Sequence, residues 1–125
     1  MSRSDEDILR FLAASFPSVW ALELLLAIKR EPRPWPRDEL VSTLRASDLV
    51  VSKALDALVA AGMVSIEEGG ARYLPANPEL GAEVDRAEEF YRSRPNKVRR
   101  AIISASASSA VAFADAFKLR RDENG

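Results

Sequence analysis

The chain has 125 residues, of which 47% are apolar and 30% charged, a composition typical of a single globular domain. It contains neither cysteine nor histidine, which excludes disulfides, thiolate metal sites and thiol or imidazole catalysis. Lysine and arginine number 18 against 19 aspartates and glutamates, so the net charge of −1 does not indicate a strongly basic nucleic-acid binder.

The near-neutral total conceals two regions of opposite charge. Residues 1–89 carry 10 Lys and Arg against 16 Asp and Glu, whereas residues 90–121 carry 8 against 1. The C-terminal quarter is therefore locally basic. Its densest stretch, here called the basic segment, spans residues 92–100 and contains Arg92, Arg94, Lys97, Arg99 and Arg100.

The sequence predicts no signal peptide and no stable membrane insertion. The first ten residues, MSRSDEDILR, are polar and acidic. The most apolar stretch, residues 101–117, includes several serines and an aspartate and falls short of the ~20 strongly apolar residues that a membrane span needs. We therefore expect a cytoplasmic protein.

Two helices are predicted in the first 30 residues. Ser4 precedes three acidic residues, a pattern typical of a capped helix start, and Phe16-Pro17 ends this helix. Ser18 caps the second helix, whose sequence VWALELLLAIKR is apolar almost all round. We expect this helix to be central, with Trp20 in the core.

Three prolines in residues 31–36 predict an ordered connector, with Pro36 as the first residue of a helix that ends near Ala46. Ser47 then caps a helix that Gly62 closes. The inward side of that helix is expected to carry four aliphatic residues: Val51, Leu55, Leu58 and Val59.

Two short β-prone runs follow, at residues 63–66 and 72–74, and the glycines between them favour a tight hairpin. Asn77-Pro78-Glu79 predicts the start of another helix. Its apolar stripe is expected to consist of Leu80, Val84, Ala87 and Tyr91. Residues 97–121 are helix-prone and include Val111, Phe113 and Phe117.

The stretch RASDLVVSKALDALVAAGMVSIEEGGARYLPA resembles the core of winged helix-turn-helix transcriptional regulators, the broad MarR-like group. The resemblance covers about residues 18–76. It implies a mainly α fold with a small β-hairpin, in which a winged helix-turn-helix core carries N- and C-terminal helices. It divides the chain into a winged-helix domain (1–76), a C-terminal helical extension (77–121) and a disordered tail (122–125).

The same resemblance implies a transcriptional regulator that binds double-stranded DNA. The recognition helix, residues 47–61, would enter the major groove, and the wing, residues 64–75, and the basic segment would contact the backbone. The expected DNA-binding residues are Arg45, Ser47, Leu49, Val50, Ser52, Lys53, Arg72, Arg92, Arg94, Lys97, Arg99 and Arg100. The C-terminal helices are expected either to form a homodimer, as in such regulators, or to fold back on the core.

The outward face of the expected recognition helix departs from this pattern. It offers Lys53 and Ser52 where base contacts normally use several cations and amides, and the wing tip carries Glu67 and Glu68. An alternative is therefore a winged-helix interaction module that binds a protein partner through Leu49, Val50 and the acidic wing.

Three structural interpretations stand beside these functional ones. Ser52 and Lys53 can be an ordinary solvated helix face. The Leu49-Val50 pair can pack on the connector at Trp35. The basic segment can pair with acids just before it, namely Glu83, Asp85, Glu88 and Glu89. We expect no enzyme, no catalytic residue, no metal and no cofactor, because the carboxylates occupy caps or solvated faces and no phosphate loop is present.

Overall fold

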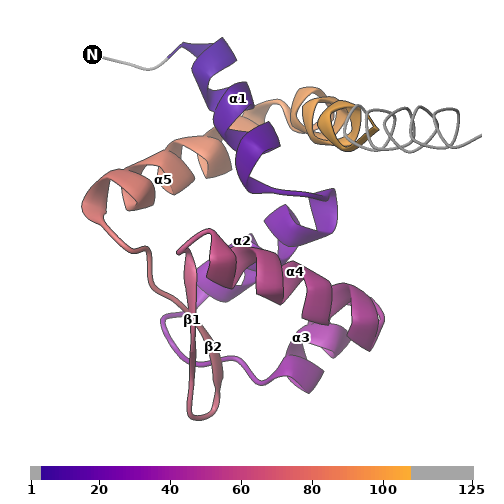
Figure 1. The fold of residues 1–125 in the computed structure, drawn as a ribbon, viewed down its shortest axis with the longest axis vertical. Coiled ribbons are helices and arrows are strands. Elements are labelled where there is room, and N and C mark those ends of the chain that lie inside the picture. The colour runs from indigo at the N-terminus through magenta and orange to yellow at the C-terminus, as the bar shows by residue number, and fades with distance from the viewer. Residues whose placement is uncertain (1–3, 108–125) are drawn as a thin grey trace, which may run out of the picture.

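A computed structural model describes residues 4–107 of the chain (Figure 1). This part is mainly helical and carries one small antiparallel hairpin, as the sequence predicted. The elements in chain order are α1 (Asp5–Ser15), α2 (Val19–Arg30), α3 (Arg37–Leu44), α4 (Asp48–Ala60), β1 (Val64–Glu67), β2 (Gly70–Tyr73) and α5 (Pro78–Ser93). Residues 95–107 are also helical.

Side-chain caps fix the start of four helices. In each, the oxygen of the capping residue accepts a hydrogen bond from a backbone N–H three residues later, which satisfies one of the donors left free in the first turn. The capping residues are Ser4, Ser18, Ser47 and Asn77, at 3.2, 3.2, 3.1 and 2.8 Å from the N–H groups. All four were predicted. Pro36 takes the N-cap position of α3 and not its first turn, and α3 ends at Leu44.

The core is built around α2, which packs against α4, α3 and β2. Leu22, Leu25 and Ile28 of α2 are buried. They belong to the same core cluster as Leu55 and Leu58, which are buried on α4. This packing stabilises the fold because it removes the apolar faces of both helices from water.

The hairpin has a two-residue loop, Glu68 and Gly69, between the paired residues Glu67 and Gly70. The connector adds to it, because Trp35 exchanges two backbone hydrogen bonds with Ala71, at 2.8 and 2.9 Å. Gly70 has φ +135°, and a Cβ there would lie 2.1 Å from the Trp35 carbonyl oxygen. Glycine is therefore required where the connector meets β2.

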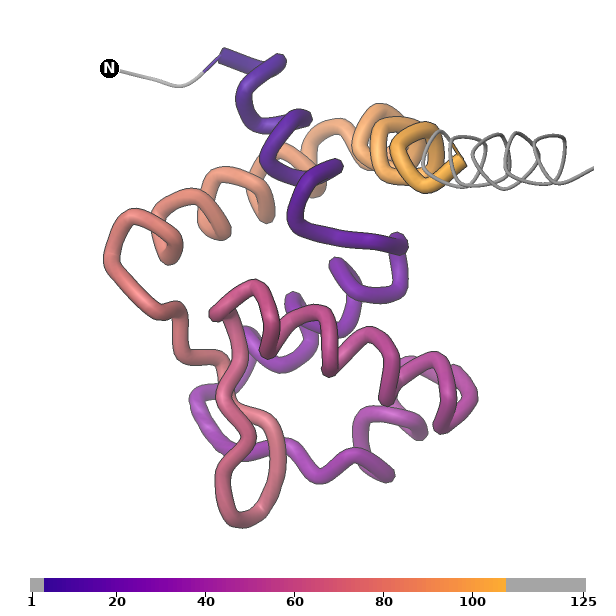
Figure 2. Tube along the Cα trace, in the orientation of Figure 1, coloured from indigo at the N-terminus to yellow at the C-terminus, as the bar shows by residue number. Residues whose placement is uncertain are grey.

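The two ends of the described chain meet on one side of the core. α5 packs against α1, and residues 95–107 run on beside them (Figure 2). The predicted α5 stripe is inward: Val84, Ala87 and Tyr91 are buried and Leu80 is partly buried. Val98 and Ile102 are buried in the same cluster as α2 and α4. At least through residue 102, the C-terminal part folds back on its own chain.

Lys29 links α2 to α5. Its Nζ lies 2.8 Å from Glu88 Oε1 and 3.1 Å from Asp85 Oδ1, and 5.7 Å from the centre of the Tyr73 ring on β2. The hydrogen bond to Glu88, followed by that to Asp85, raises the pKa of Lys29 above its ordinary value of 10.5 against the opposing effect of burial.

Two predictions about side-chain burial were wrong. Trp20 is 45% exposed, and Val59 is exposed on the outer side of α4. Trp20 lies in the first turn of α2, where Val50 and Ala54 of α4 approach it on one side only. Val59 points toward the space beside the hairpin. The predictions that concern Val111, Phe113, Phe117 and the tail 122–125 fall outside the described residues.

Among residues 4–107 no single helix is long and apolar enough to cross a membrane. Helices α1 and α2 together have the length and composition of a span, but they are bent by 98° to each other.

Candidate functional site

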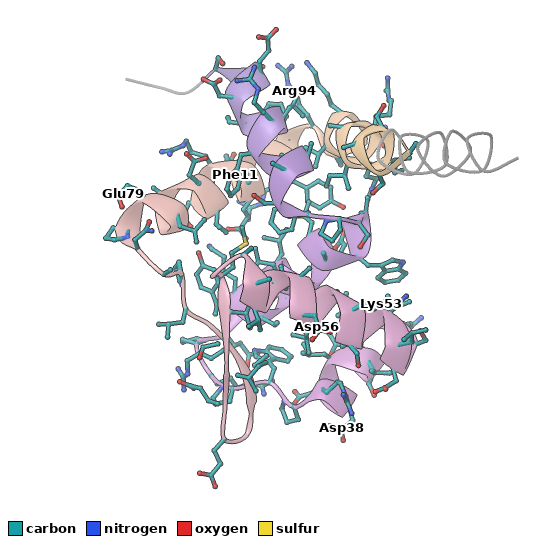
Figure 3. All side chains as sticks on the ribbon, in the orientation of Figure 1. Phe11, Asp38, Lys53, Asp56, Glu79 and Arg94 are labelled. Carbon is teal, nitrogen blue, oxygen red and sulfur yellow. The ribbon has the colours of Figure 1, made fainter. Side chains whose placement is uncertain are left out.

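The outer face of α4 is mixed in character. Leu49 is 63% exposed near its start, and Lys53 and Asp56 are exposed further along (Figure 3). Within the described chain neither Lys53 nor Asp56 has a hydrogen bond or ion pair. The turn before α4 holds Arg45, which is exposed and takes a left-handed conformation with φ 54°. Among residues 4–107, Lys53 on this face and Arg45 in the turn before it therefore have no partner.

Other cations near α4 are already paired. Arg37, at the start of α3, lies 3.2 Å from Asp48 and donates to the Ser52 hydroxyl at 3.3 Å. Arg72 on β2 lies 2.6 Å from Glu67 and donates to the Pro32 carbonyl at 3.1 Å. Ser52 and Arg72, both predicted to contact DNA, are thus engaged with protein groups.

The connector shows the same internal pairing. Arg33 binds Glu31 at 2.9 Å and Glu39 at 2.5 Å, and its guanidinium lies 3.8 Å from the centre of the Trp35 ring. The hydrogen bond to Glu39 raises the pKa of Arg33, and the same bond lowers the pKa of Glu39. These exposed pairs neutralise the connector without adding much stability.

An apolar groove separates α4 from the hairpin. Its volume is about 560 Å³. Buried Leu55 and Ala71 lie at its floor, and Val59 and Ile66 are exposed along it. The remaining lining residues are Trp35, Arg37, Ser52, Asp56, Ala60 and Gly70. A protein surface with two exposed aliphatic side chains over an apolar floor is suited to contact with apolar groups.

The groove is the part of the site that sequence reasoning missed. Val64 and Ile66 share one face of β1 by the alternation of strand side chains, but only Val64 is buried, because the hairpin extends beyond the core (Figure 1). The outward position of Val59 completes the wall. The signal was present in the pattern of α4, where Val59 lies beside Ser52 and Asp56 on the helical wheel.

The opposite flank of α4 faces Trp20. Val50 and Ala54 line a narrow space there with Trp20, Leu24 and Leu44. The interpretation that Leu49 and Val50 pack on the connector at Trp35 is therefore wrong. Trp35 lies on the groove side of α4 instead.

The basic segment does not form one cluster with α4. Arg94 lies 3.7 Å from Asp5, and Figure 3 places it beside α1, away from Lys53. Arg92 pairs with Glu88 at 3.7 Å and with Glu89 at 3.2 Å, as the interpretation of internal pairing expected.

The rest of the basic segment is less constrained. Lys97 and Arg100 are exposed and have no partner within the described residues. Arg99 lies over the Tyr91 ring at 5.6 Å and lines a hollow of about 470 Å³ with Trp20. Burial, followed by the hydrogen bond that Tyr91 donates to Glu23, raises the pKa of Tyr91.

In the part of the chain that the structure describes, no group of three or more His, Cys, Asp or Glu is arranged to hold a metal ion. Comparisons with models of protein families, with curated proteins and with solved structures found no match.

Proposed function

We propose that residues 18–76 form a winged helix-turn-helix used as a protein-interaction module, and that the groove between α4 and the hairpin binds a segment of another protein. The observation that carries the proposal is the groove itself, with Val59 and Ile66 exposed over an apolar floor. A reader of DNA would need donors and cations at this position.

The unpaired charges around the groove define the partner. Asp56 lines it and Glu68 stands at the hairpin loop, and neither has a partner within the described residues. Glu67 is neutralised by Arg72. The segment that fits has apolar side chains at helical spacing, which enter the groove, and Lys or Arg on its flanks, which face the two acids.

Pairing of the local cations supports a protein partner over DNA. Arg33, Arg37 and Arg72 are each held by a carboxylate, so a phosphate would have to displace an existing contact. Carboxylates near phosphates are also repulsive. The attraction of this face for a polyanion is therefore small.

The proposal is tested with a synthetic peptide that has leucines at i, i+3, i+4 and i+7 and lysines at both ends, measured by fluorescence anisotropy against the full chain. We expect saturable binding, and changes in the amide NMR signals of residues 55–60 and 66–71. Val59→Asp and Ile66→Asp should each weaken binding at least about tenfold, because burying one aliphatic side chain contributes roughly 1.5–3 kcal/mol.

Two controls make the result specific. Leu74→Asp changes an exposed aliphatic residue that does not line the groove, and it should leave the affinity unchanged. A peptide with glutamates in place of the lysines should bind more weakly. The proposal fails if the peptide does not bind, if Val59→Asp and Ile66→Asp are without effect, or if both peptides bind equally.

DNA binding remains the second candidate, and one observation favours it. Helix α3, the short turn 45–47 and α4 follow each other as in a helix-turn-helix, and two cations without a partner among the described residues lie there, Arg45 in the turn and Lys53 on α4. Titration of genomic DNA fragments at low salt tests it. Two phosphate contacts predict a slope of log K against log salt of about −2, and five further contacts from the basic segment would steepen it by roughly 4 to 5.

One substitution separates the two candidates. Glu68→Lys removes an unpaired acid at the hairpin loop without breaking the pair between Glu67 and Arg72. It should strengthen binding to DNA and weaken binding of the basic peptide. If Glu68→Lys strengthens binding to DNA and leaves binding of the peptide unchanged, DNA becomes the first candidate.

A further inference from the structure

The two tryptophans of the chain have opposite environments. Trp35 is 5% exposed, whereas Trp20 is 45% exposed. Ile103 is 59% exposed, and Trp20 and Ile103 both line a hollow of about 500 Å³. The other residues that line it are uncharged: Pro17, Ser18, Val19, Ile102, Ser106 and Ala107. A large aromatic and a large aliphatic side chain are therefore left in water around one hollow.

The fold holds these two side chains in place. The Ser106 hydroxyl donates to the Pro17 carbonyl at 2.6 Å, which ties the helix of residues 95–107 to the junction of α1 and α2. Ser18 caps α2 at the same junction, and Ile102 is buried in the core cluster. The exposed pair therefore belongs to an ordered surface and not to a frayed helix end.

Three arginines lie around this apolar pair. Arg30 and Arg99 line a second hollow, of about 470 Å³, that Trp20 also borders. Arg99 and the exposed Arg100 come four and three residues before Ile103, so both neighbour it on the surface of their helix. These five residues are called the Trp20 surface below.

The arginines of the Trp20 surface have no carboxylate partner among residues 4–107. Arg30 and Arg100 make no hydrogen bond or ion pair there, and Arg99 donates to the Asn96 side-chain oxygen at 3.5 Å. One carboxylate, Glu23, lines the second hollow and accepts a hydrogen bond already. The surface therefore presents three cations against one anion beside its exposed apolar side chains.

We propose that the Trp20 surface binds reversibly to the face of a phospholipid bilayer that contains anionic lipids. Trp20 and Ile103 enter the boundary between the headgroups and the acyl chains, where an indole ring is favoured. The arginines contact the lipid phosphates, because a cation near an anionic leaflet is attracted to it.

The combination of side chains favours this occupant over others. A nucleic acid offers phosphates to the arginines but little apolar surface to an exposed isoleucine. A basic protein segment would be repelled by the arginines. An anionic bilayer supplies phosphates and an apolar interior in adjacent layers, so it satisfies both kinds of side chain.

This proposal does not depend on the function proposed for the groove. Val59 of α4 lines the groove, whereas Val50 and Ala54, on the other flank of α4, face Trp20. Binding to vesicles and binding of the peptide therefore involve different residues, and either can fail alone.

Co-sedimentation of the full chain with vesicles, combined with tryptophan emission, tests the proposal. The vesicles contain phosphatidylcholine and phosphatidylglycerol in equal parts, and vesicles of phosphatidylcholine alone are the comparison. We expect saturable binding to the anionic vesicles only, weakened by salt, with emission that moves to shorter wavelength because Trp20 leaves water. In Trp20→Phe the remaining emission, from buried Trp35, should not shift.

Two substitutions with matched controls test the apolar and the charged part of the surface. Ile103→Ser should weaken vesicle binding about tenfold, whereas Leu74→Ser changes an exposed aliphatic residue outside both hollows and should have no effect. Arg100→Gln should weaken binding about fivefold, whereas Arg72→Gln removes the same charge from the hairpin and should have no effect. Circular dichroism checks that the variants are folded, and Ile103→Ala replaces Ile103→Ser if the latter is not.

Four results would overturn the proposal. The first is a chain that does not bind the anionic vesicles, and the second is equal binding to both kinds of vesicle. The third is binding that resists Ile103→Ser as well as it resists Leu74→Ser. The fourth is Trp20 emission that shifts without lipid, either with protein concentration or on addition of an oligonucleotide, which would assign the surface to a second copy or to nucleic acid.

Discussion

The two sides of α4 carry similar aliphatic residues, but those on one side are buried and those on the other are exposed. Its inner side carries Leu55 and Leu58, which are buried against α2, while its outer side carries Leu49 and Val59, which remain in water. Apolar character alone does not tell the sides apart. The difference lies in what covers them, so the inner side determines the fold and the outer side is available to a partner.

The largest expected effect comes from the inner side. Leu58→Ala should lower the free energy of unfolding by about 2–5 kcal/mol, because Leu58 is fully buried and the lost methyl groups leave a cavity. Leu49→Ala, the same change on the outer side, should alter it by less than about 0.5 kcal/mol. Urea denaturation of both variants measures the contrast, and similar losses would show that the outer side is covered.

Next in size is the contact between the connector and the hairpin, which forms one wall of the groove. Gly70→Ala should cost about 2–3 kcal/mol, because the added Cβ meets the Trp35 carbonyl and alanine is strained at φ +135°. Gly81→Ala in α5 is the control, since its Cβ would lie an ordinary 3.4 Å from Pro75. Thermal unfolding should show a lower midpoint for the first variant only.

The cap at the start of α4 should make an intermediate contribution to the free energy of unfolding. Ser47→Ala removes the cap on the Val50 N–H and should destabilise the chain by about 1 kcal/mol. Ser52→Ala removes only the exposed contact with Arg37, and we expect less than about 0.5 kcal/mol. If Ser52→Ala had the larger effect, the contact with Arg37 would be the structural one.

The smallest effect in this series belongs to the charged link on the far side of α2. Lys29→Met should cost up to about 1 kcal/mol near neutral pH, since Asp85 and Glu88 lose their cation. Because the pKa of Lys29 is raised by folding, its contribution is complete below 10.5 and is lost as the pH rises through the folded-state pKa. The difference between wild type and variant, measured by urea denaturation, should therefore shrink at alkaline pH; a constant difference would indicate lost packing only.

Local signals predicted most of the helices and the hairpin. Helix caps and hairpin glycines act on residues close to them in sequence, so a short sequence pattern predicts their effect. The caps are Ser4, Ser18, Ser47 and Asn77. The exposure of Trp20 could not be predicted in this way, because it depends on how α4 and residues 95–107, both distant in sequence, lie beside the first turn of α2.

The candidate site was predicted only in outline. The helix and hairpin that form it were identified, and the scarcity of cations on α4 was visible. The groove joins Val59 and Ile66, which are close in sequence, but its depth depends on how far the hairpin extends beyond the core (Figure 1). The bridge from Trp35 to Ala71 and the hydrogen bond from Arg72 to Pro32 join segments distant in sequence. Contacts between distant segments leave no pattern in the local sequence, so the spacing of residues could not predict them.

The packing of α1 against α5 affects the order in which parts of the chain can fold during synthesis. Residues 5–15 leave the ribosome before the other named elements, but the helix that packs against them, residues 78–93, is the last named element to be made. The pairing of α2 with α4 joins residues 19–60, so it can begin once residue 60 has emerged, before the hairpin and α5 add to the same core. We therefore expect the N-terminal helix to dock last, so that a nascent chain stalled before α5 has a protected centre and an accessible first helix.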